Sequence, residues 1–470
     1  MSNFTADDFY IDQGMITGLT DAGRDKLIAS GCTIDTFPED VVAIGDYAFD
    51  HVDITAILDW GNITSIGQGA FNCSRVTEIP GNWGKIVSIG DRAFHFNNIT
   101  TLPDSWGDAP SIGSYAFRDN KITALPDSWG RITSIGGYAF CGNQIAALPD
   151  SWGNITRVGD GAFCNNKITA LPDSWGRITN IGDGAFECNQ INALPQSWGN
   201  ITSIGNYAFY TNKNITELPS SWGKITNIGD SAFRCNEIAE LPDSWGTITR
   251  IDEDVFSYNS ITALPDSWGN ITSIGDSAFR DNKITALPKS WGGITSVGDC
   301  AFHDNHITEL PDNWGDVDII GYRAFDDNDI TCLPDSWGKV SNLGDHAFCN
   351  NLIATLPGSW GNITSIGEST FQYNQITALP NDWGDVTIIG DCVFHDNQIT
   401  ELPESWGRIN SIGRSSFESN NIVALPGDWG RVTSIGDYAF CNNQITALPD
   451  SWGEVAYVGK NAFGENQIVE

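Results

Sequence analysis

Apolar and polar residues alternate along this chain in a pattern that repeats every 23 residues. The stretch from Ile155 to Arg177 reads ITRVGDGAFCNNKITALPDSWGR, and glycine, asparagine and proline separate its short apolar runs. Near-copies of this stretch form 19 units, marked by a glycine column from Gly45 to Gly459 that is replaced once, by Asp252. Such a period predicts stacked units, each of which needs a neighbour to bury its apolar face.

Each unit is predicted to contain two short strands and a turn. The segment Ile-Thr-Ala-Leu-Pro, as at residues 168–172, is β-branched and ends in proline, so the main parallel sheet is placed there. Ile-Thr-Ser-Ile, as at residues 132–135, is predicted as a second strand on the return. Gly-Asp-x-Ala-Phe is turn-like and is predicted to open one helical turn with Asp or Ser as its N-cap. The expected fold is a repeat solenoid, mostly β and loop with short helical turns.

The two ends of the chain differ from the repeats. Residues 1–38 lack the pattern and contain a predicted helix that starts after Thr20 and stops near Gly31, which suits an N-terminal cap. Residues 39–470 form the predicted solenoid. It stops part-way through a unit, without a polar capping segment. We expect either a segment of a longer surface protein or an open end that meets another chain.

The repeat resembles a known family. Residues 162–172, AFCNNKITALP, are similar to the second half of the leucine-rich repeat pattern, and residues 434–440, SIGDYAF, resemble the BspA-like class of bacterial leucine-rich repeats. The resemblance implies a right-handed stack of coils on a cell surface, used for adhesion or recognition. One departure leaves the strand register open, because the usual strand leucine two places before the Phe column is replaced by other residues: Tyr47, Gly69, Arg92, Gly161, Ser231 and Cys300.

Charge narrows the choice of partners. The chain has 59 acidic and 24 basic residues, a formal net charge of −35, which argues against nucleic acid and anionic membrane surfaces as partners. No apolar run approaches the roughly 18–20 residues of a membrane-spanning helix, so no membrane insertion is expected. The expected location is extracellular or at a cell surface, in a bacterium.

Several columns are predicted to serve the fold. All 18 tryptophans fall in one column, which favours packing between coils over a platform for sugars. An asparagine three residues after each Phe is typical of an asparagine ladder, as at Asn120, Asn143, Asn282 and Asn397. Among the 11 cysteines, Cys141 and Cys164 share a column in adjacent coils and could form one disulfide.

Metal sites are less favoured than structural roles. Aspartates follow the repeat glycine or the proline, and we interpret them as helix caps and a solubilising surface in preference to calcium ligands: Asp160, Asp183, Asp230, Asp276 and Asp391, then Asp127, Asp150, Asp173 and Asp266. His303 and His306 are close in sequence, with His95 and His395 in the His303 column, but no third ligand is indicated. No metal site and no cofactor are predicted.

No nucleophile elbow, phosphate loop or convergent acid and base is present, so the chain is not expected to be an enzyme. The leading hypothesis is a cell-surface recognition or adhesin segment that binds a protein or glycan, on another cell or matrix, over an extended repeat face. The alternatives are a filament or lattice subunit that self-associates end to end, and an ice-binding protein that uses a threonine column, as at Thr123, Thr169 and Thr262. The candidate ligand-binding residues are variable positions after Phe and on the outward strand: Arg118, Glu187, Tyr210, Arg234, Arg280 and Gln372, with Glu217, Glu240, Glu309 and Glu401.

Overall fold

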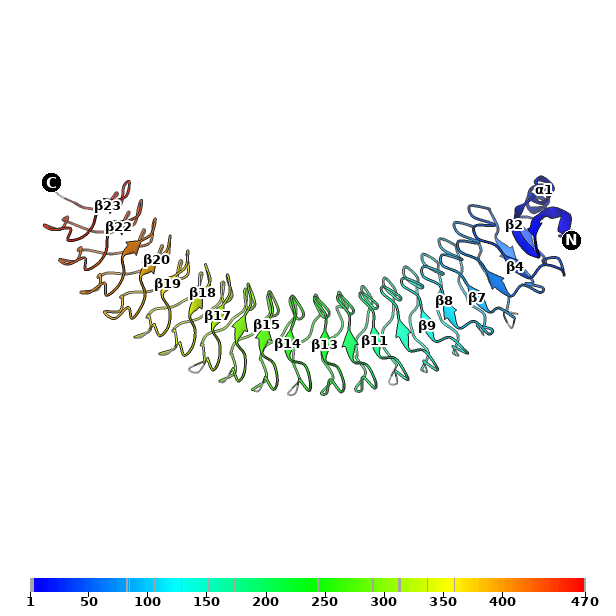
Figure 1. Cartoon of the computed structure of the whole chain (residues 1–470), viewed down its shortest axis with the longest axis horizontal. Coiled ribbons are helices and arrows are strands. Elements are labelled where there is room, and N and C mark those ends of the chain that lie inside the picture. The colour runs from blue at the N-terminus through cyan, green and yellow to red at the C-terminus, as the bar shows by residue number, and fades with distance from the viewer. Residues whose placement is uncertain are drawn as a thin grey trace. The chain divides into compact units, whose positions relative to one another are not determined.

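The computed structural model describes most of the chain, and its contacts divide it into two compact units, Met1–Asn236 and Glu237–Glu470. Both units are stacks of short coils (Figure 1). The described residues are 4–81, 83, 85–104, 106–127, 129–150, 152–172, 175–242, 245–266, 268–289, 291–311, 314–335, 337–358 and 360–468.

The N-terminal segment covers the first coil of the first unit. It contains the 3₁₀ helix η1 (Ala6–Asp8), an antiparallel hairpin of β1 (Phe9–Asp12) and β2 (Met15–Leu19), and α1 (Asp21–Ala29). Strand β2 pairs in parallel with β4 (Ala43–Ile44), which joins the hairpin to the sheet of the repeats. The predicted helix is confirmed, and the Thr20 hydroxyl oxygen accepts the Gly23 N–H at 3.1 Å as its N-cap.

The main sheet of each unit is a ladder of two-residue parallel strands. In the first unit β4 continues into β6–β13, while β3 (Thr33–Ile34) pairs with β5 (Ala56–Ile57); the second unit has β14–β18 and β19–β23. The remaining bounds are β6 Ser65–Ile66, β7 Ser88–Ile89, β8 Ser111–Ile112, β9 Ser134–Ile135, β10 Arg157–Val158, β11 Asn180–Ile181, β12 Ser203–Ile204, β13 Asn227–Ile228, β14 Arg250–Ile251, β15 Ser273–Ile274, β16 Ser296–Val297, β17 Ile319–Ile320, β18 Asn342–Leu343, β19 Ser365–Ile366, β20 Ile388–Ile389, β21 Ser411–Ile412, β22 Ser434–Ile435 and β23 Tyr457–Val458.

The sheet lies on a different segment from the one predicted. It runs through Ile-Thr-Ser-Ile, whereas the Ile-Thr-x-Leu column forms paired strands at β3 and β5 and isolated bridges in some later coils, such as Ala170 with Ala193. The glycine after Ser-Ile explains the difference, since a Cβ on Gly113 would lie 2.5 Å from the Gly90 carbonyl carbon. Glycine therefore lets successive backbones approach closely, whereas the proline after Ile-Thr-x-Leu has no N–H for a ladder.

The predicted helical turn at Gly-Asp-x-Ala-Phe is wrong. Ala116 N–H donates to the Gly113 carbonyl and Arg118 N–H to the Tyr115 carbonyl, forming consecutive β-turns in which Tyr115 and Asp119 have φ of 60° and 54°. This geometry turns the N–H groups of Tyr115 and Phe117 toward the next coil, where carbonyls accept them at 2.8 Å. The residues that replace the strand leucine share this left-handed position: Tyr47, Gly69, Arg92, Gly161, Ser231 and Cys300.

The core consists of side chains that stack in register. Phe140 and Phe163 have ring centroids 5.5 Å apart, and Trp129 and Trp152 are 5.8 Å apart, all almost completely buried. The predicted structural role of the tryptophans is therefore confirmed. Each ring that packs on its neighbour in this way keeps its coil in register with the next.

The asparagine ladder and the disulfide are also confirmed. Buried Asn143 donates through Nδ2 to the Phe117 carbonyl of the preceding coil at 2.9 Å, and its Oδ1 accepts the Ile122 N–H at 3.0 Å. Cys141 and Cys164 form a disulfide between adjacent coils. The asparagine, phenylalanine and tryptophan columns are thus occupied by the fold, so ligand binding falls to other positions.

Candidate binding ridge

Three columns of each coil form what we call the variable ridge. They are the left-handed residue before Ala-Phe and the two residues after Phe, and they are exposed in some coils and buried in others, as at Cys141. Their backbones pair between coils, as when Phe96 N–H donates to the Arg118 carbonyl at 3.0 Å, and the Asp119 N–H to the Cys141 carbonyl at 2.9 Å. Side chains of successive coils therefore stand in rows, and their identity varies without changing the backbone.

A basic cluster occupies the ridge of the first unit. We define it as Arg92, His95, Phe96, Tyr115 and Arg118. The guanidinium carbons of Arg92 and Arg118 lie 5.3 and 5.5 Å from the centre of the Tyr115 ring, within cation–π range. Phe96 is 54% exposed, although it is a large apolar side chain. A shallow hollow of about 390 Å³ is lined by the cluster together with Tyr47, Asn72 and Cys73.

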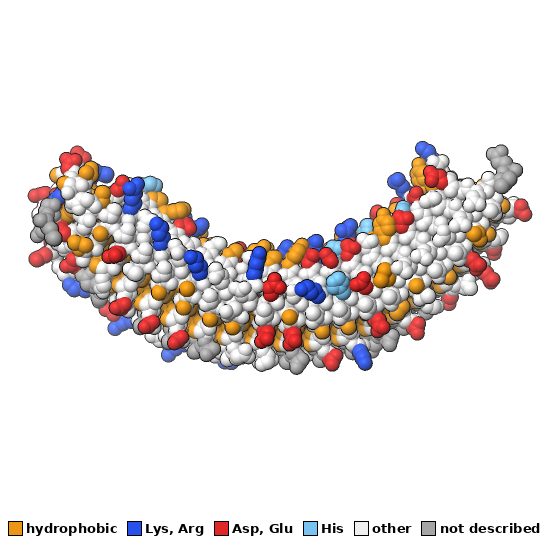
Figure 2. All heavy atoms as spheres, turned by 180° about the vertical axis from the view of Figure 1, so that it is seen from behind, with side chains coloured by type: hydrophobic (Ala, Val, Ile, Leu, Met, Phe, Trp, Pro, Cys, Tyr) orange, Lys and Arg blue, Asp and Glu red, His pale blue; other side chains and the backbone are white. Residues whose placement is uncertain are grey.

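The charges of the basic cluster are only partly compensated. Arg118 Nε lies 3.1 Å from Asp119 Oδ2, and His95 Nε2 lies 3.7 Å from the same oxygen. Burial, with the charges of Arg118 and Arg92, lowers the pKa of His95, and Asp119 offsets this only in part. His95 is therefore neutral near pH 7, and two guanidiniums face one carboxylate. Elsewhere acidic side chains are spread over the visible face (Figure 2).

An acidic cluster occupies the two columns after Phe in the second unit. We define it as His303, Asp304, Asp326 and Asp327. Ligand atoms of His303, Asp326 and Asp327 all lie within 4.8 Å of one another. The sequence indicated no third ligand for His303, but its partners come from the following coil, where Asp326 shares its column and Asp327 the adjacent one. The partners of His303 can therefore be found by aligning adjacent coils, but not from the spacing of residues within one coil.

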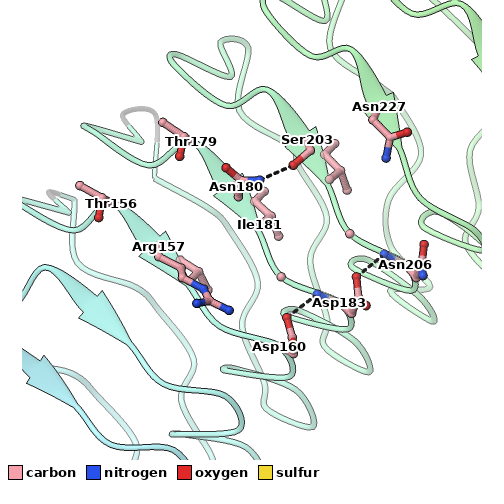
Figure 3. A pocket seen from close by; sticks show the side chains of 14 residues that line it. Thr156, Arg157, Asp160, Thr179, Asn180, Ile181, Asp183, Ser203, Asn206 and Asn227 are labelled. Carbon is pink, nitrogen blue, oxygen red and sulfur yellow. Dashed lines mark hydrogen bonds between the residues drawn. The ribbon is translucent and has the colours of Figure 1, made fainter.

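A polar groove follows strands β10–β13 (Figure 3). It has a volume of about 530 Å³ and is lined by Arg157 and Asn180 of the strands and by Asp160 and Asp183 of the turns. Asp160 Oδ1 accepts the Asp183 N–H at 3.2 Å, and Asn180 Nδ2 donates to the Ser203 hydroxyl at 2.6 Å. Because these groups bond within the groove, it is a weaker candidate for ligand binding than the ridge.

The aspartates after the glycine do not cap helices, contrary to prediction. They cap the next coil, as when Asp91 Oδ1 accepts the Ser114 N–H and Asp276 Oδ1 the Asp299 N–H, at 2.7 and 2.8 Å. The turns contain no helix, and the N–H left free by each turn lies one coil away. Of the aspartates after the proline, Asp127, Asp150 and Asp266 are exposed, and Asp173 lies outside the described residues.

The predicted binding residues separate onto two faces of the coils. The variable ridge contains those in the column directly after Phe: Arg118, Glu187, Tyr210, Arg234, Arg280 and Gln372. The exposed Ile-Thr-x-Leu segment contains the others: Glu217, Glu240, Glu309 and Glu401. Of the ten, Arg118 alone belongs to the basic cluster; Arg280 Nε pairs with Asp281 Oδ2 at 3.0 Å, much as Arg118 Nε pairs with Asp119 Oδ2. Burial raises the pKa of half-buried Glu187.

Sequence reasoning missed the partners of Arg118, namely Arg92, His95, Phe96 and Tyr115. Arg92 and His95 stood out for other reasons, one as a departure from the strand pattern and the other as a column mate of His303. That these residues lie close to Arg118 becomes evident only once the left-handed column and the two columns after Phe are known to share one ridge. End-to-end assembly and ice binding stay predictions, as does the absence of a catalytic role.

The coil stack, the glycine and asparagine columns and the outward ridge define a leucine-rich repeat protein. The sequence matches the BspA type leucine rich repeat region over residues 30–123, 110–234, 193–286, 249–377 and 364–470, and the chain belongs to that family. Leucine-rich repeat families are non-enzymatic scaffolds that typically bind proteins. In the described part of the chain, no helix has the length and apolar character needed to cross a membrane.

Solved structures with a similar fold come from several bacteria. YopM from Yersinia enterocolitica WA-314 is 17% identical, with 95% of this chain and 90% of that chain covered and a TM-score of 0.47. A leucine-rich repeat protein from Bacteroides ovatus ATCC 8483 is 18% identical, with coverage of 86% and 91% and a TM-score of 0.42. InlJ from Listeria monocytogenes is 16% identical, with coverage of 73% and 70% and a TM-score of 0.39. No curated protein sequence matches the chain.

Proposed function

We propose that this chain is a non-enzymatic recognition protein of a bacterial cell surface, and that its basic cluster binds an acidic segment of another protein. The observation that carries the proposal is the grouping of Arg92 and Arg118 around Tyr115, beside exposed Phe96, in a chain of net charge −35. Family membership supports a surface location and protein binding.

The residues of the basic cluster are of the types that dominate protein interfaces. Arginine and tyrosine are enriched among the residues that contribute most to binding energy, because each offers a large contact area together with directed hydrogen bonds. A guanidinium can donate two parallel N–H groups to one carboxylate, which favours an acidic ligand. Phe96 adds apolar area beside the charges, so the preferred segment combines carboxylates with an apolar side chain.

The charge of the remaining surface contributes to specificity. An acidic ligand is repelled by most of the chain and attracted only where guanidiniums exceed carboxylates, so like-charge repulsion disfavours other positions on the ridge. Asp119 balances one of the two guanidiniums in the free protein. A ligand carboxylate would compete with it for Arg118 and would bind Arg92 without that competition.

The test measures binding of the full chain to two peptide libraries. Peptides of the first are rich in Asp and Glu and contain one aromatic residue, and peptides of the second have Lys and Arg where the first has Asp and Glu. We expect selection of acidic peptides, and the variant Arg92→Ala/Arg118→Ala should bind them at least about tenfold more weakly. The control is Arg131→Ala, because Arg131 lies in the same unit, is 75% exposed in its side chain and pairs with Asp108. It should bind like the parent chain.

Two results would contradict the proposal. One is equal binding of acidic and basic libraries, and the other is unchanged affinity in the double variant. A parallel array of acidic glycans separates the ligand classes, since binding to glycans without binding to peptides would replace the protein partner with a carbohydrate.

A further inference from the structure

We propose that His303, Asp326 and Asp327 form a binding site for a divalent transition metal of the zinc class. The site lies on the variable ridge of the second unit. It is independent of the basic cluster, which lies in the first unit and contains no group of this kind.

The backbone ladder brings these three residues together. His303 directly follows Phe302, and Asp326 and Asp327 are the first and second residues after Phe325 in the next coil. Phe302 N–H donates to the Ala324 carbonyl at 2.8 Å, and the Asp304 N–H to the Asp326 carbonyl at 3.1 Å. These inter-coil bonds fix the two coils in register, so the three side chains start from adjacent points on one surface.

The distances between ligand atoms suit a small contraction around an ion. His303 Nδ1 lies 3.5 Å from Asp326 Oδ2 and 3.9 Å from Asp327 Oδ2. Tetrahedral ligands about 2.1 Å from a zinc ion lie about 3.4 Å apart. The two distances from His303 therefore need to shorten by only a few tenths of an ångström, and the three ligand atoms, which all lie within 4.8 Å of one another, can close on an ion by rotation about the χ angles.

Asp326 provides the independent evidence for a missing ligand. Its side chain is only 5% exposed, Asp326 Oδ1 is buried without a nitrogen or oxygen donor, and the side-chain hydrogen bond to this carboxylate comes from the weakly donating thiol of Cys349. Arg323 Nε lies 3.6 Å from Oδ2 of this carboxylate, beyond hydrogen-bond distance. A buried carboxylate with an unsatisfied oxygen is costly, and a bound cation would stabilise it.

The neighbouring side chains orient the proposed ligands. Asn350 Nδ2 donates to Asp327 Oδ1 at 2.8 Å, which leaves Asp327 Oδ2 toward His303. Such outer contacts are typical of metal centres, because they fix the direction of each ligand. Asp304 and Asp281 add further carboxylates nearby. The excess of carboxylates attracts a cation of charge two.

The donor set indicates the class of metal. One imidazole nitrogen with two carboxylate oxygens suits Zn²⁺ and its neighbours Co²⁺ and Ni²⁺, whereas Ca²⁺ and Mg²⁺ prefer oxygen donors alone. His303 Nδ1 also lies 3.2 Å from the Asp326 carbonyl oxygen, so the metal would replace a hydrogen bond from this nitrogen. Three protein ligands leave a fourth position for water or for a side chain of a bound partner.

The test is calorimetric titration of the full, chelator-treated chain with Zn²⁺ in excess Mg²⁺. We expect one tight Zn²⁺ site in the parent chain. Each of the variants Asp326→Asn and His303→Gln should bind Zn²⁺ with an affinity lower by a factor of roughly ten or more. His306→Gln is the matched control, since His306 Nδ1 faces a single carboxylate, Asp329, at 3.3 Å and is exposed. It should retain the tight site.

Folding and metal binding are separated by a second measurement. Without metal, Asp326→Asn should be at least as stable to heat as the parent chain, because it removes a buried charge, and only the parent chain should gain stability from Zn²⁺. If Asp326→Asn does not fold, Asp327→Asn takes its place. Absence of a tight Zn²⁺ site in the parent chain, or equal Zn²⁺ affinity in the ligand variants and in His306→Gln, would overturn the proposal.

Discussion

The basic cluster and the acidic cluster stand on the variable ridge of the same repeat, the first on all three columns and the second on the two columns after Phe, yet they carry opposite charge. Their backbones match: Phe94 N–H donates to the Ala116 carbonyl in one and Phe302 N–H to the Ala324 carbonyl in the other, both at 2.8 Å. The Phe94–Phe117 and Phe302–Phe325 rings stack at 5.4 and 5.3 Å. Local charge therefore varies independently of the fold, because inter-coil bonds and buried rings, and not the ridge side chains, hold each coil.

The independence of fold and charge has a structural cause. Ridge residues satisfy their backbone N–H groups either through the neighbouring coil or, directly after Phe, through the turn of their own coil, as when Arg118 N–H donates to the Tyr115 carbonyl. Their side chains are therefore free to change. Even the left-handed position accepts large side chains, with Tyr115 at φ 60° and Arg323 at φ 52°. Such a position is strained for a residue with a Cβ, and the ladder around it must offset that strain.

The largest expected effect breaks the backbone that both clusters share. Gly113→Ala in the first unit and Gly344→Ala in the second place a Cβ against the backbone of the preceding coil, at Gly90 and Gly321. Each should lower the free energy of unfolding by about 2–4 kcal/mol, as measured by urea denaturation. Gly293→Ala is the control, since a Cβ there would meet nothing within 4 Å. Equal losses in all three variants would show that close backbone approach does not set the coil spacing.

A smaller effect should distinguish the two units by redox state. The Cys141–Cys164 disulfide closes a 23-residue loop in the first unit, whereas the described cysteines of the second unit are free. Reduction should lower the stability of the surrounding coils by about 3 kcal/mol. Hydrogen exchange would then accelerate in residues 136–186 more than in residues 321–367. Cys141→Ala/Cys164→Ala should not respond to reductant, and a response there would assign the effect to another thiol.

The smallest expected effect is a pH dependence of ligand binding that differs between the two clusters. The pKa of His95 is lowered in the folded chain, so its neutral form favours folding and this contribution is lost as pH falls below about 6.5. Protonation adds a positive charge beside Arg92, Arg118 and Asp119, so affinity for acidic peptides should rise about two- to fivefold between pH 7 and 5.

The acidic cluster should show the opposite trend, since protons compete with a metal for its ligands. Zn²⁺ affinity is therefore expected to fall over the same pH range in which peptide affinity rises. Titration calorimetry at both pH values, with His95→Gln as the control for the peptide, tests both trends. A rise in peptide affinity that survives in His95→Gln would assign it to another group.

The sequence predicted those features that depend on periodicity. Register alone places Trp129 over Trp152, Asn143 beside Phe117 and Cys141 beside Cys164, because identical columns must meet in a stack. The position of the sheet was not predictable from β-propensity, since Ile-Thr-x-Leu is as β-branched as Ile-Thr-Ser-Ile. Close backbone approach at the glycine decides between them, and that is a contact between coils.

The candidate sites were predictable only in part. Arg118 was identified as a variable residue, but its partners required knowledge that the turn residues are left-handed and share one surface. The same holds for Asp326 and Asp327 beside His303. Local sequence does not reveal this geometry, because the N–H groups that the turns leave free, such as those of Tyr115 and Phe117, donate to carbonyls of the next coil.

The amino-acid sequence by itself determined that this chain is a stack of repeated coils with its apolar columns inside, since a strict period of Ile, Phe and Trp can be buried in no other simple way. Tertiary structure decided which segment became the sheet and which outward residues became neighbours. The physical reason is that both depend on hydrogen bonds and contacts between coils, each 23 residues apart along the chain, and not on the preferences of any single segment.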